Sequence, residues 1–346
     1  MAKAGENELK AQLKSKALKN VYMLYGEEAY LKQHYVSRLK KAALSGGMED
    51  FNYHQYEGKN ASMDSILMDA QMLPMMSEYT FVLVHDYPFE KSSEDVKKLK
   101  EFFKDIPESC VLVFWFDSID VNPKQASKWN TIIKLFADAG DAVELQKRSE
   151  GDLVKLITAA AQKKKCTISP YCAKYFIGLV GSDLQTLLNE LEKICSFVGE
   201  GEITKEIIDD LAVKSLQARV YDLSKFILKG DSSGAYEVLR ALFAQREEPI
   251  GILAIIASYY VDMYRTKCAK AADVPINDLS SYFSYKGREF VLRNASRDSA
   301  SIGTRKLRQS LDVLADCDSK MKSTSINSQI LLEETVAKLL MIRQER

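Results

Sequence analysis

The stretch that decides the fold is Val21-Tyr22-Met23-Leu24-Tyr25, which runs directly into Gly26-Glu27-Glu28-Ala29-Tyr30-Leu31. The first five residues form a short apolar run of the kind found in central strands that are buried on both faces. The residues after Gly26 predict the start of a helix. A strand that passes through a glycine turn into a helix is where nucleotide-binding domains hold phosphate. The stretch therefore predicts an α/β domain of nucleotide-binding shape.

The joint at Gly26 lacks the residues that a phosphate loop needs. Several glycines normally let backbone N–H groups converge on the anion, and a Lys and a Ser or Thr contact the phosphates and Mg²⁺. Here a single glycine is followed by Glu27 and Glu28, and no lysine precedes Lys32. The two carboxylates suit the positive end of a helix dipole, which a phosphate would otherwise use. We therefore expect no nucleotide at this joint.

Short apolar runs alternate with helical stretches through residue 146, which is typical of a parallel sheet covered by helices on both faces. The runs at 80–85 and 110–116 are almost continuously apolar, as central strands must be. The predicted strands lie near 21–25, 52–56, 80–85, 110–116 and 142–145. The predicted helices lie near 27–42, 62–72, 92–104 and 123–138.

Beyond residue 146 the strand signal stops, and the pattern predicts helices only. Residues 149–213 indicate a compact module of short helices with capping residues before them. Longer amphipathic helices are predicted near 216–229, 233–245, 249–270, 302–319 and 326–344. The predicted fold class is therefore α/β plus all-α, with domains at 1–147, 148–213 and 214–346.

Composition and charge predict an ordinary intracellular protein. The chain of 346 residues carries 48 basic and 48 acidic side chains, so no overall field draws it to nucleic acid or to a membrane. Its polar, acidic start predicts no secretory signal. The longest nearly apolar run, 250–261, is shorter than the roughly 20 residues that a membrane span needs. We expect a cytoplasmic location and no membrane partner.

Cysteine and histidine spacing predicts no metal site. None of the six cysteines forms a C-x-x-C pair, and the three histidines are isolated in sequence. Free, mostly buried thiols in a reducing compartment are the expectation. We predict no bound metal and no cofactor.

Four sequence motifs resemble one known family. They are Tyr22–Leu31, Leu73–Glu78, Gly181–Leu184 with Asn189–Lys193, and Arg246–Ile250. In this order and spacing they are similar to the delta subunits of bacterial DNA polymerase III, which belong to the clamp loader. The resemblance extends over essentially the whole chain.

The resemblance implies an AAA+ fold that has lost ATP binding. It implies a RecA-like sheet domain over 1–147, a small helical lid domain over 148–213 and a C-terminal helical collar domain over 214–346. The degenerate nucleotide site would comprise Gly26, Glu27, Glu28 and Asp86, since Tyr87 follows Asp86 where an active ATPase has a catalytic glutamate. No ATPase activity of its own is implied, although the family is classed with the polymerase holoenzyme. From its residue type and place, Asp86 also fits a turn residue at a strand end.

The resemblance also implies which residues contact the sliding clamp. Sliding-clamp ligands resemble Gln-x-apolar-x-Leu-Phe, and Gln71, Leu73, Met75 and Met76 fall on these positions, with Pro74 between them. Pro74 is expected to end the helix of 62–72 and to present the two methionines, whose flexible side chains suit an apolar pocket. In the family this contact opens the beta sliding clamp. The implied partners are the clamp, the tau/gamma ATPase subunits, delta prime and primer-template DNA.

Other interpretations of the residues remain open at this point. Leu73, Met75 and Met76 fit a loop packed under the sheet as well as a clamp contact. The chain could be a clamp-binding adaptor outside the loader, or an atypical AAA+ ATPase.

Two further groups of side chains have alternative roles. Lys163–Lys165 and the basic cluster of Arg297, Arg305, Lys306 and Arg308 fit DNA contacts or solvated helix faces. The apolar stripe of the 249–270 helix should be divided between core and a subunit contact. Its members are Ile252, Ile255, Ile256, Tyr259, Tyr260, Met263 and Tyr264.

Overall fold

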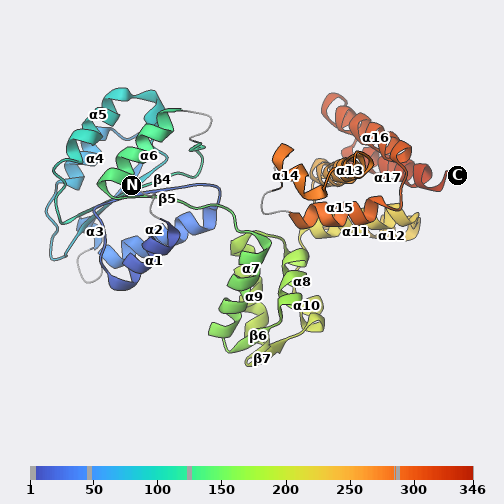
Figure 1. Cartoon of the computed structure of the whole chain (residues 1–346), viewed down its shortest axis with the longest axis horizontal. Helices are drawn as coiled ribbons and strands as arrows, with labels where there is room; N and C mark the ends of the chain where they lie inside the picture. Colours follow the sequence, from blue (N-terminus) through green and yellow to red (C-terminus); the bar gives the residue numbers. More distant parts are fainter. Residues whose placement is uncertain (1–4, 45–48, 123–126, 284, 286–288, 346) are drawn as a thin grey trace. The chain divides into compact units, whose positions relative to one another are not determined.

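The structure is a computed structural model that describes residues 5–44, 49–122, 127–283, 285 and 289–345. The chain divides into two compact units, Met1–Lys147 and Arg148–Arg346. Figure 1 shows a sheet flanked by helices in the first unit and helical packing in the second. The predicted division of residues 148–346 into lid and collar stays a prediction.

The first unit contains a parallel five-stranded sheet in the order β2-β3-β4-β1-β5. Each adjacent pair is parallel, with Val21 opposite Leu112 and Tyr53 opposite Phe81. The strands are β1 Val21–Tyr25, β2 Tyr53–Glu57, β3 Thr80–His85, β4 Cys110–Trp115 and β5 Asp141–Glu144. Five strands were predicted at these places, with ends that differ by at most one residue. The predicted α/β class of this region is confirmed.

Helices cover both faces of this sheet (Figure 1). On one face, α4, α5 and α6 pack against alternate residues of the central strands, with Phe114 and Phe136 at the centre of a buried aromatic cluster. On the other, α2 contacts β3 and β4, and α1 contacts β5. The helices are α1 Glu6–Ser15, α2 Ala29–Ala43, α3 Glu49–Asn52, α4 Met63–Ala70, η1 Phe89–Lys91, α5 Ser93–Phe102 and α6 Ser127–Ala139. Residues 123–126 of the predicted 123–138 helix lie outside the described residues.

The second unit is almost wholly helical. Its first part contains α7 Glu150–Lys163, β6 Cys166–Ile168, α8 Pro170–Val180, α9 Leu184–Val198, β7 Gly201–Ile203 and α10 Lys205–Leu211. Its second part contains α11 Leu216–Lys229, α12 Ser232–Ala244, α13 Pro249–Ala271, η2 Ile276–Asp278, α14 Leu279–Tyr282, α15 Glu289–Ser299, α16 Thr304–Ser323 and α17 Ser328–Gln344. The five long helices predicted in the second part are confirmed.

The prediction of helices alone beyond residue 146 was wrong. Strands β6 and β7 form a two-stranded parallel sheet, with Cys166 opposite Gly201. Each strand has three residues, too few for an alternating pattern to stand out in the sequence. Helix α15 was also not predicted, because few of its residues are apolar. Three of these, Val291, Leu292 and Ala295, are buried.

The apolar stripe of α13 belongs mostly to the core of the second unit. Ile252, Ile256, Tyr259, Tyr260 and Met263 are buried, and Ile255 and Tyr264 are partly buried against the same cluster. The stripe therefore leaves little apolar surface for a subunit contact. Among the described residues no helix combines the length and apolarity that a membrane span requires.

Candidate functional sites

The joint after β1 is closed by the backbone of the chain itself. Gly26 has a φ of 113°, and a Cβ at this position would lie 2.5 Å from the carbonyl oxygen of Leu145. The backbone N–H of Glu28 donates to that same oxygen at 3.0 Å. In a phosphate loop such N–H groups point at the anion. Here the glycine allows the end of β1 to approach the residue after β5.

Lys32 fills the space next to this joint. It follows Gly26 by six positions, the spacing between the first glycine and the lysine of a phosphate loop. Its side chain is buried, and its Nζ donates to the carbonyl oxygens of Gly26 at 2.8 Å and Phe116 at 2.7 Å. Asp117 Oδ1 lies 3.3 Å away. The ammonium group therefore joins the ends of β1 and β4. The spacing of Lys32 from Gly26 was a signal that the sequence interpretation did not use.

The two glutamates of the joint occupy different surroundings. Glu27 is exposed, whereas Glu28 is buried at the N-cap of α2. A carboxylate there is stabilised by the helix dipole. The predicted placement of both residues at a helix N-terminus is therefore observed.

Asp86 caps the loop that follows β4. Its buried carboxylate accepts hydrogen bonds from the backbone N–H groups of Asp117 at 2.8 Å and Ser118 at 3.0 Å. Burial alone would raise the pKa of Asp86, but these hydrogen bonds outweigh it and lower the pKa below the ordinary value. Asp86 itself has a φ of 51°, a conformation that Asp tolerates in turns. The carboxylate that would hold Mg²⁺ in an ATPase is bound to backbone instead.

The predicted clamp-contact residues form an exposed apolar tip, defined here as Gln71–Met76. Leu73 is 85% exposed and Met76 78%, while Met72 and Met75 are about half exposed. Gln71 is also exposed, and Pro74 is partly buried. The alternative that these side chains pack under the sheet is therefore wrong for the described structure. An apolar group of this kind in water is typical of a surface that binds a partner.

The helix before the tip ends earlier than predicted. Helix α4 stops at Ala70, and the N–H of Gln71 still donates to the carbonyl oxygen of Leu67. Pro74 lies four positions beyond Ala70, so it does not end the helix directly. Residues 71–79 form neither helix nor strand. The tip is thus an irregular loop between α4 and β3.

Met76 has a left-handed backbone, which yields a prediction. Its φ is 54°, a conformation that costs an L-residue about 1 kcal/mol but costs glycine little. We expect the Met76→Gly variant to be more stable than Met76→Ala by about 1 kcal/mol, because only the alanine keeps the strain. Denaturant unfolding of the two variants measures this difference. Equal stability would show that Met76 does not hold this conformation in solution.

The basic residues considered for DNA mostly have partners within the chain. Lys164 pairs with Glu192 at 2.7 Å, and Lys165 pairs with Glu200. Arg297 pairs with Asp298 at 2.9 Å. These contacts favour structural roles over phosphate binding.

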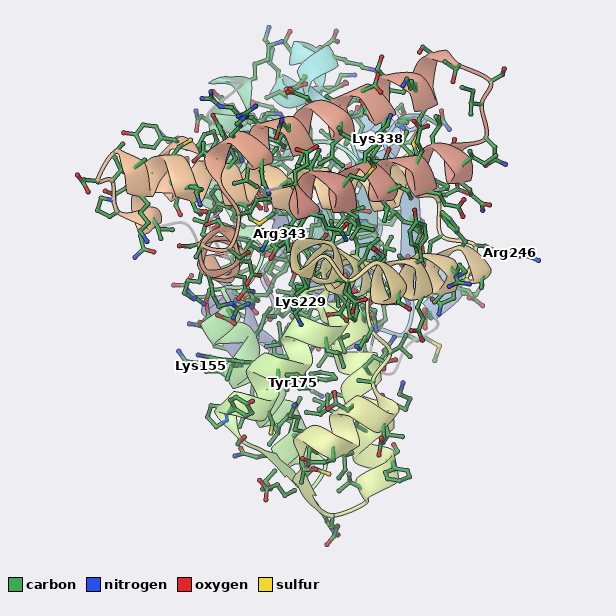
Figure 2. The ribbon with its side chains drawn as sticks, turned by 90° about the vertical axis from the view of Figure 1, so that its right-hand side faces the viewer. Lys155, Tyr175, Lys229, Arg246, Lys338 and Arg343 are labelled. Carbon is green, nitrogen blue, oxygen red and sulfur yellow. The ribbon has the colours of Figure 1, made fainter. Side chains whose placement is uncertain are left out.

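The other members of the basic cluster, Arg305, Lys306 and Arg308, lie in the first turns of α16. Lys306 Nζ donates to the carbonyl oxygen of Arg343, and Arg343 Nε donates to that of Leu228. Figure 2 labels Arg343 and Lys229, the residue that follows Leu228 in α11. Arg308 donates to the Tyr264 hydroxyl at 2.8 Å, while Arg305 is exposed. Lys306 and Arg343 thus bind backbone carbonyl groups at the ends of neighbouring helices.

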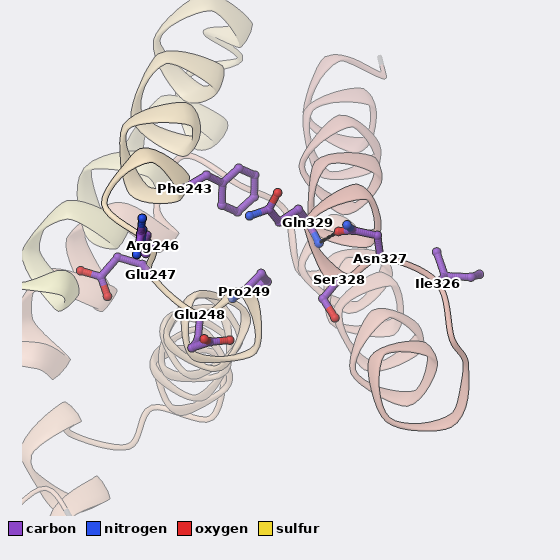
Figure 3. A pocket seen from close by; sticks show the side chains of 9 residues that line it. All are labelled: Phe243, Arg246, Glu247, Glu248, Pro249, Ile326, Asn327, Ser328 and Gln329. Atoms are coloured by element: carbon purple, nitrogen blue, oxygen red, sulfur yellow. Dashed lines mark hydrogen bonds between the residues drawn. The ribbon is translucent and has the colours of Figure 1, made fainter.

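An open groove of about 470 Å³ lies between the α12–α13 turn and the start of α17 (Figure 3). One side is lined by Phe243, Arg246, Glu247, Glu248 and Pro249, and the other by Ile326, Asn327, Ser328 and Gln329. Glu247 is already paired with Arg219 at 2.6 Å. Its lining includes Arg246–Pro249, which belong to the Arg246–Ile250 motif, to which the sequence assigned no role.

The first unit has a five-stranded parallel sheet, and Lys32 bonds to the turn after β1 where a phosphate loop would lie. Together with the helical unit that follows, this defines an AAA+-like protein without a phosphate loop. The family model for "DNA polymerase III, delta subunit" matches residues 22–146, and that for the delta subunit's C-terminal domain matches residues 217–339. The chain belongs to the DNA polymerase III delta subunit family.

Individual relatives agree with this assignment. The chain is 26% identical to the DNA polymerase III subunit delta of Bacillus subtilis over 338 residues, which cover 95% of both chains. It is 22% identical to the probable delta subunit of Aquifex aeolicus over 290 residues, covering 80% of this chain and 81% of the other. The solved structure of the Bacillus subtilis DNA clamp loader delta protein matches with a TM-score of 0.65 at 24% identity, covering 97% and 99% of the two chains. This last match supports the fold.

Proposed function

We propose that the chain acts in clamp loading as the subunit that binds the beta sliding clamp, through the tip Gln71–Met76. Membership of the delta subunit family supports a role in the loader. The observation that carries the clamp contact is the exposure of Leu73 and Met76 on a loop whose sequence resembles clamp ligands. Burying an exposed Leu or Met side chain in a partner's pocket contributes about 1.5 to 3 kcal/mol.

We also propose that this contact opens the ring, as the resemblance to the delta subunits implies. A binding subunit shifts a partner's equilibrium only by the difference between its affinities for the two states. The proposed tip would therefore bind an open clamp more tightly than a closed one. The energy comes from apolar contact at the tip, without nucleotide at Gly26.

The proposed partners are the clamp, the tau/gamma ATPase subunits, delta prime and primer-template DNA. ATP would act through the sister subunits, since Lys32 and Asp86 are engaged with backbone groups of this chain. We propose the cytoplasm as the location, because these partners work on the bacterial chromosome. Internal ion pairs of Lys164, Lys165 and Arg297 argue against them as DNA contacts.

A reconstituted loading reaction tests this function. Labelled clamp is loaded onto primed circular DNA by the ATPase subunits and delta prime, with and without the chain. We expect loading to require the chain, and Leu73→Ala to lower it by at least about 10-fold. Met341→Ala, at an exposed methionine of α17, is the matched control and should load normally.

The other functions predict different results. A chain that binds the clamp but does not co-purify with the ATPase subunits would be an adaptor outside the loader. Loading that proceeds equally well without the chain would contradict the proposal. Tight ATP binding by the isolated chain would indicate an ATPase.

A further inference from the structure

We propose that Asn52 is a positioning residue of the clamp-contact tip, a role that rests on the proposed function of the tip. Asn52 is the last residue of α3 and precedes the edge strand β2. It is far from the tip in sequence, and its side chain is 1% exposed. Its side-chain amide is nevertheless hydrogen-bonded to Met75, within the tip.

Asn52 makes two hydrogen bonds to the backbone of one tip residue. Its Nδ2 donates to the carbonyl oxygen of Met75 at 2.8 Å, and the N–H of Met75 donates to its Oδ1 at 2.7 Å. An amide side chain offers a donor and an acceptor side by side, so it pairs with a residue's backbone as a neighbouring strand would. Among side chains of this length only asparagine supplies both groups.

Thr80 fixes the other end of the exposed segment. Its hydroxyl donates to the carbonyl oxygen of Met72 at 3.0 Å, and its side chain is buried at the start of β3. The two attachments at Met72 and Met75 enclose Leu73 and Pro74. The backbone that carries the most exposed side chain is thus held on both sides.

The helix before the tip is attached to the sheet as well. Asp69, in the last turn of α4, accepts a hydrogen bond from the Tyr56 hydroxyl and lies 3.0 Å from His54 Nδ1. Tyr56 and His54 both belong to β2, the strand that follows Asn52. The edge of the sheet therefore supports both the helix end and the loop.

This arrangement has a consequence for binding. A loop without helix or strand would lose backbone freedom when it docks, and that loss lowers affinity. The bonds from Asn52 remove much of this freedom before the clamp arrives. They also fix the backbone of Met75, which directly precedes Met76. The left-handed φ of 54° at Met76 needs such support from its surroundings. Asn52 acts on affinity through the backbone, without contacting the clamp.

The test compares two asparagines whose side chains hydrogen-bond to loop backbone, both substituted in the full chain. Asn52→Ala should weaken clamp binding by about 10-fold or more, because the loop must be ordered on docking. Asn52→Asp keeps the acceptor for the Met75 N–H but places a carboxylate oxygen against the Met75 carbonyl oxygen, so its affinity should also fall well below that of the wild type. Asn20→Ala is the control, since Asn20 Nδ2 donates to the carbonyl oxygens of Pro107, Glu108 and Cys110 in a different loop.

Two readouts separate positioning from general destabilisation. Clamp affinity is measured well below the melting temperature of every variant, and amide hydrogen exchange is followed at Met75. Faster exchange at Met75 and weaker binding in Asn52→Ala, with normal binding in Asn20→Ala, support the proposal. If Asn52→Ala does not fold, Asn52→Asp carries the same comparison.

The outcomes distinguish this inference from the function on which it rests. If the wild type binds and Leu73→Ala weakens binding, but both Asn52 variants bind within about twofold of wild type, positioning by Asn52 is overturned alone. Equal weakening by Asn20→Ala overturns it too. Absence of any wild-type binding overturns the proposed function and this inference together.

Discussion

Replacing both Met75 and Met76 with alanine is expected to weaken clamp binding by at least about 100-fold, equivalent to about 3 kcal/mol. In the free chain Met76 is 78% exposed and Met75 50% exposed. Contact with the clamp would therefore remove a large apolar area of both side chains from water. Each truncation removes apolar contact and leaves part of the clamp pocket unfilled. Isothermal titration of the purified variant with the clamp measures the effect.

The same titration needs two controls. Met341→Ala changes the same residue type at 64% exposure in α17 and should leave affinity unchanged. Thermal unfolding should show that the double variant is folded, because neither methionine belongs to the core. An affinity within about threefold of wild type would mean that the clamp contact lies elsewhere.

The second large effect is expected at Asp86. The Asp86→Ala variant should lose about 3 kcal/mol of unfolding free energy, because it removes the buried carboxylate that accepts hydrogen bonds from the backbone N–H groups of Asp117 and Ser118. Denaturant unfolding measures the loss. The control is Asp64→Ala, whose carboxylate is exposed and pairs with Lys98 at the surface, and it should change stability by less than about 1 kcal/mol. Equal effects at both positions would contradict the capping role.

Asp86 also gives a pH dependence with a defined sign. Its pKa is lowered in the folded chain, so the charged form is stabilised by folding. That contribution is complete above the ordinary Asp value of 3.8 and is lost as the pH falls through the lower folded pKa. The stability difference between wild type and Asp86→Asn should therefore shrink below about pH 4. A difference that grows on acidification would contradict this account.

The sequence predicted the central sheet well because burial on both faces leaves a local signature. Val111–Phe114 and Phe81–Val84 are continuous apolar runs that solvent-facing strands do not show. Strand β2 carries a weaker signal, since it lies at the edge and mixes polar and aromatic residues. Its start was predicted one residue early, at Asn52. Strands β6 and β7 are too short to leave any pattern.

The candidate sites also differ in how far local sequence could predict them. The local motif was enough to single out Leu73, Met75 and Met76 as candidates for a clamp contact, but their exposure depends on how α4 and β3 pack. The roles of Asn52 and Lys32 depend on contacts with residues far along the chain, at Met75 and Phe116. Of the two, only Lys32 could have been suspected from the sequence, because it follows Gly26 by six positions. Long-range hydrogen bonds of this kind need the fold.

Equilibrium binding of the purified full chain to the sliding clamp of the same organism, without nucleotide, tests whether the tip binds the clamp. We predict saturable binding that ATP does not change, because the tip carries the affinity and Lys32 and Asp86 are bonded to backbone groups at the nucleotide joint. Binding that requires ATP, or no binding of the wild-type chain at all, would contradict it.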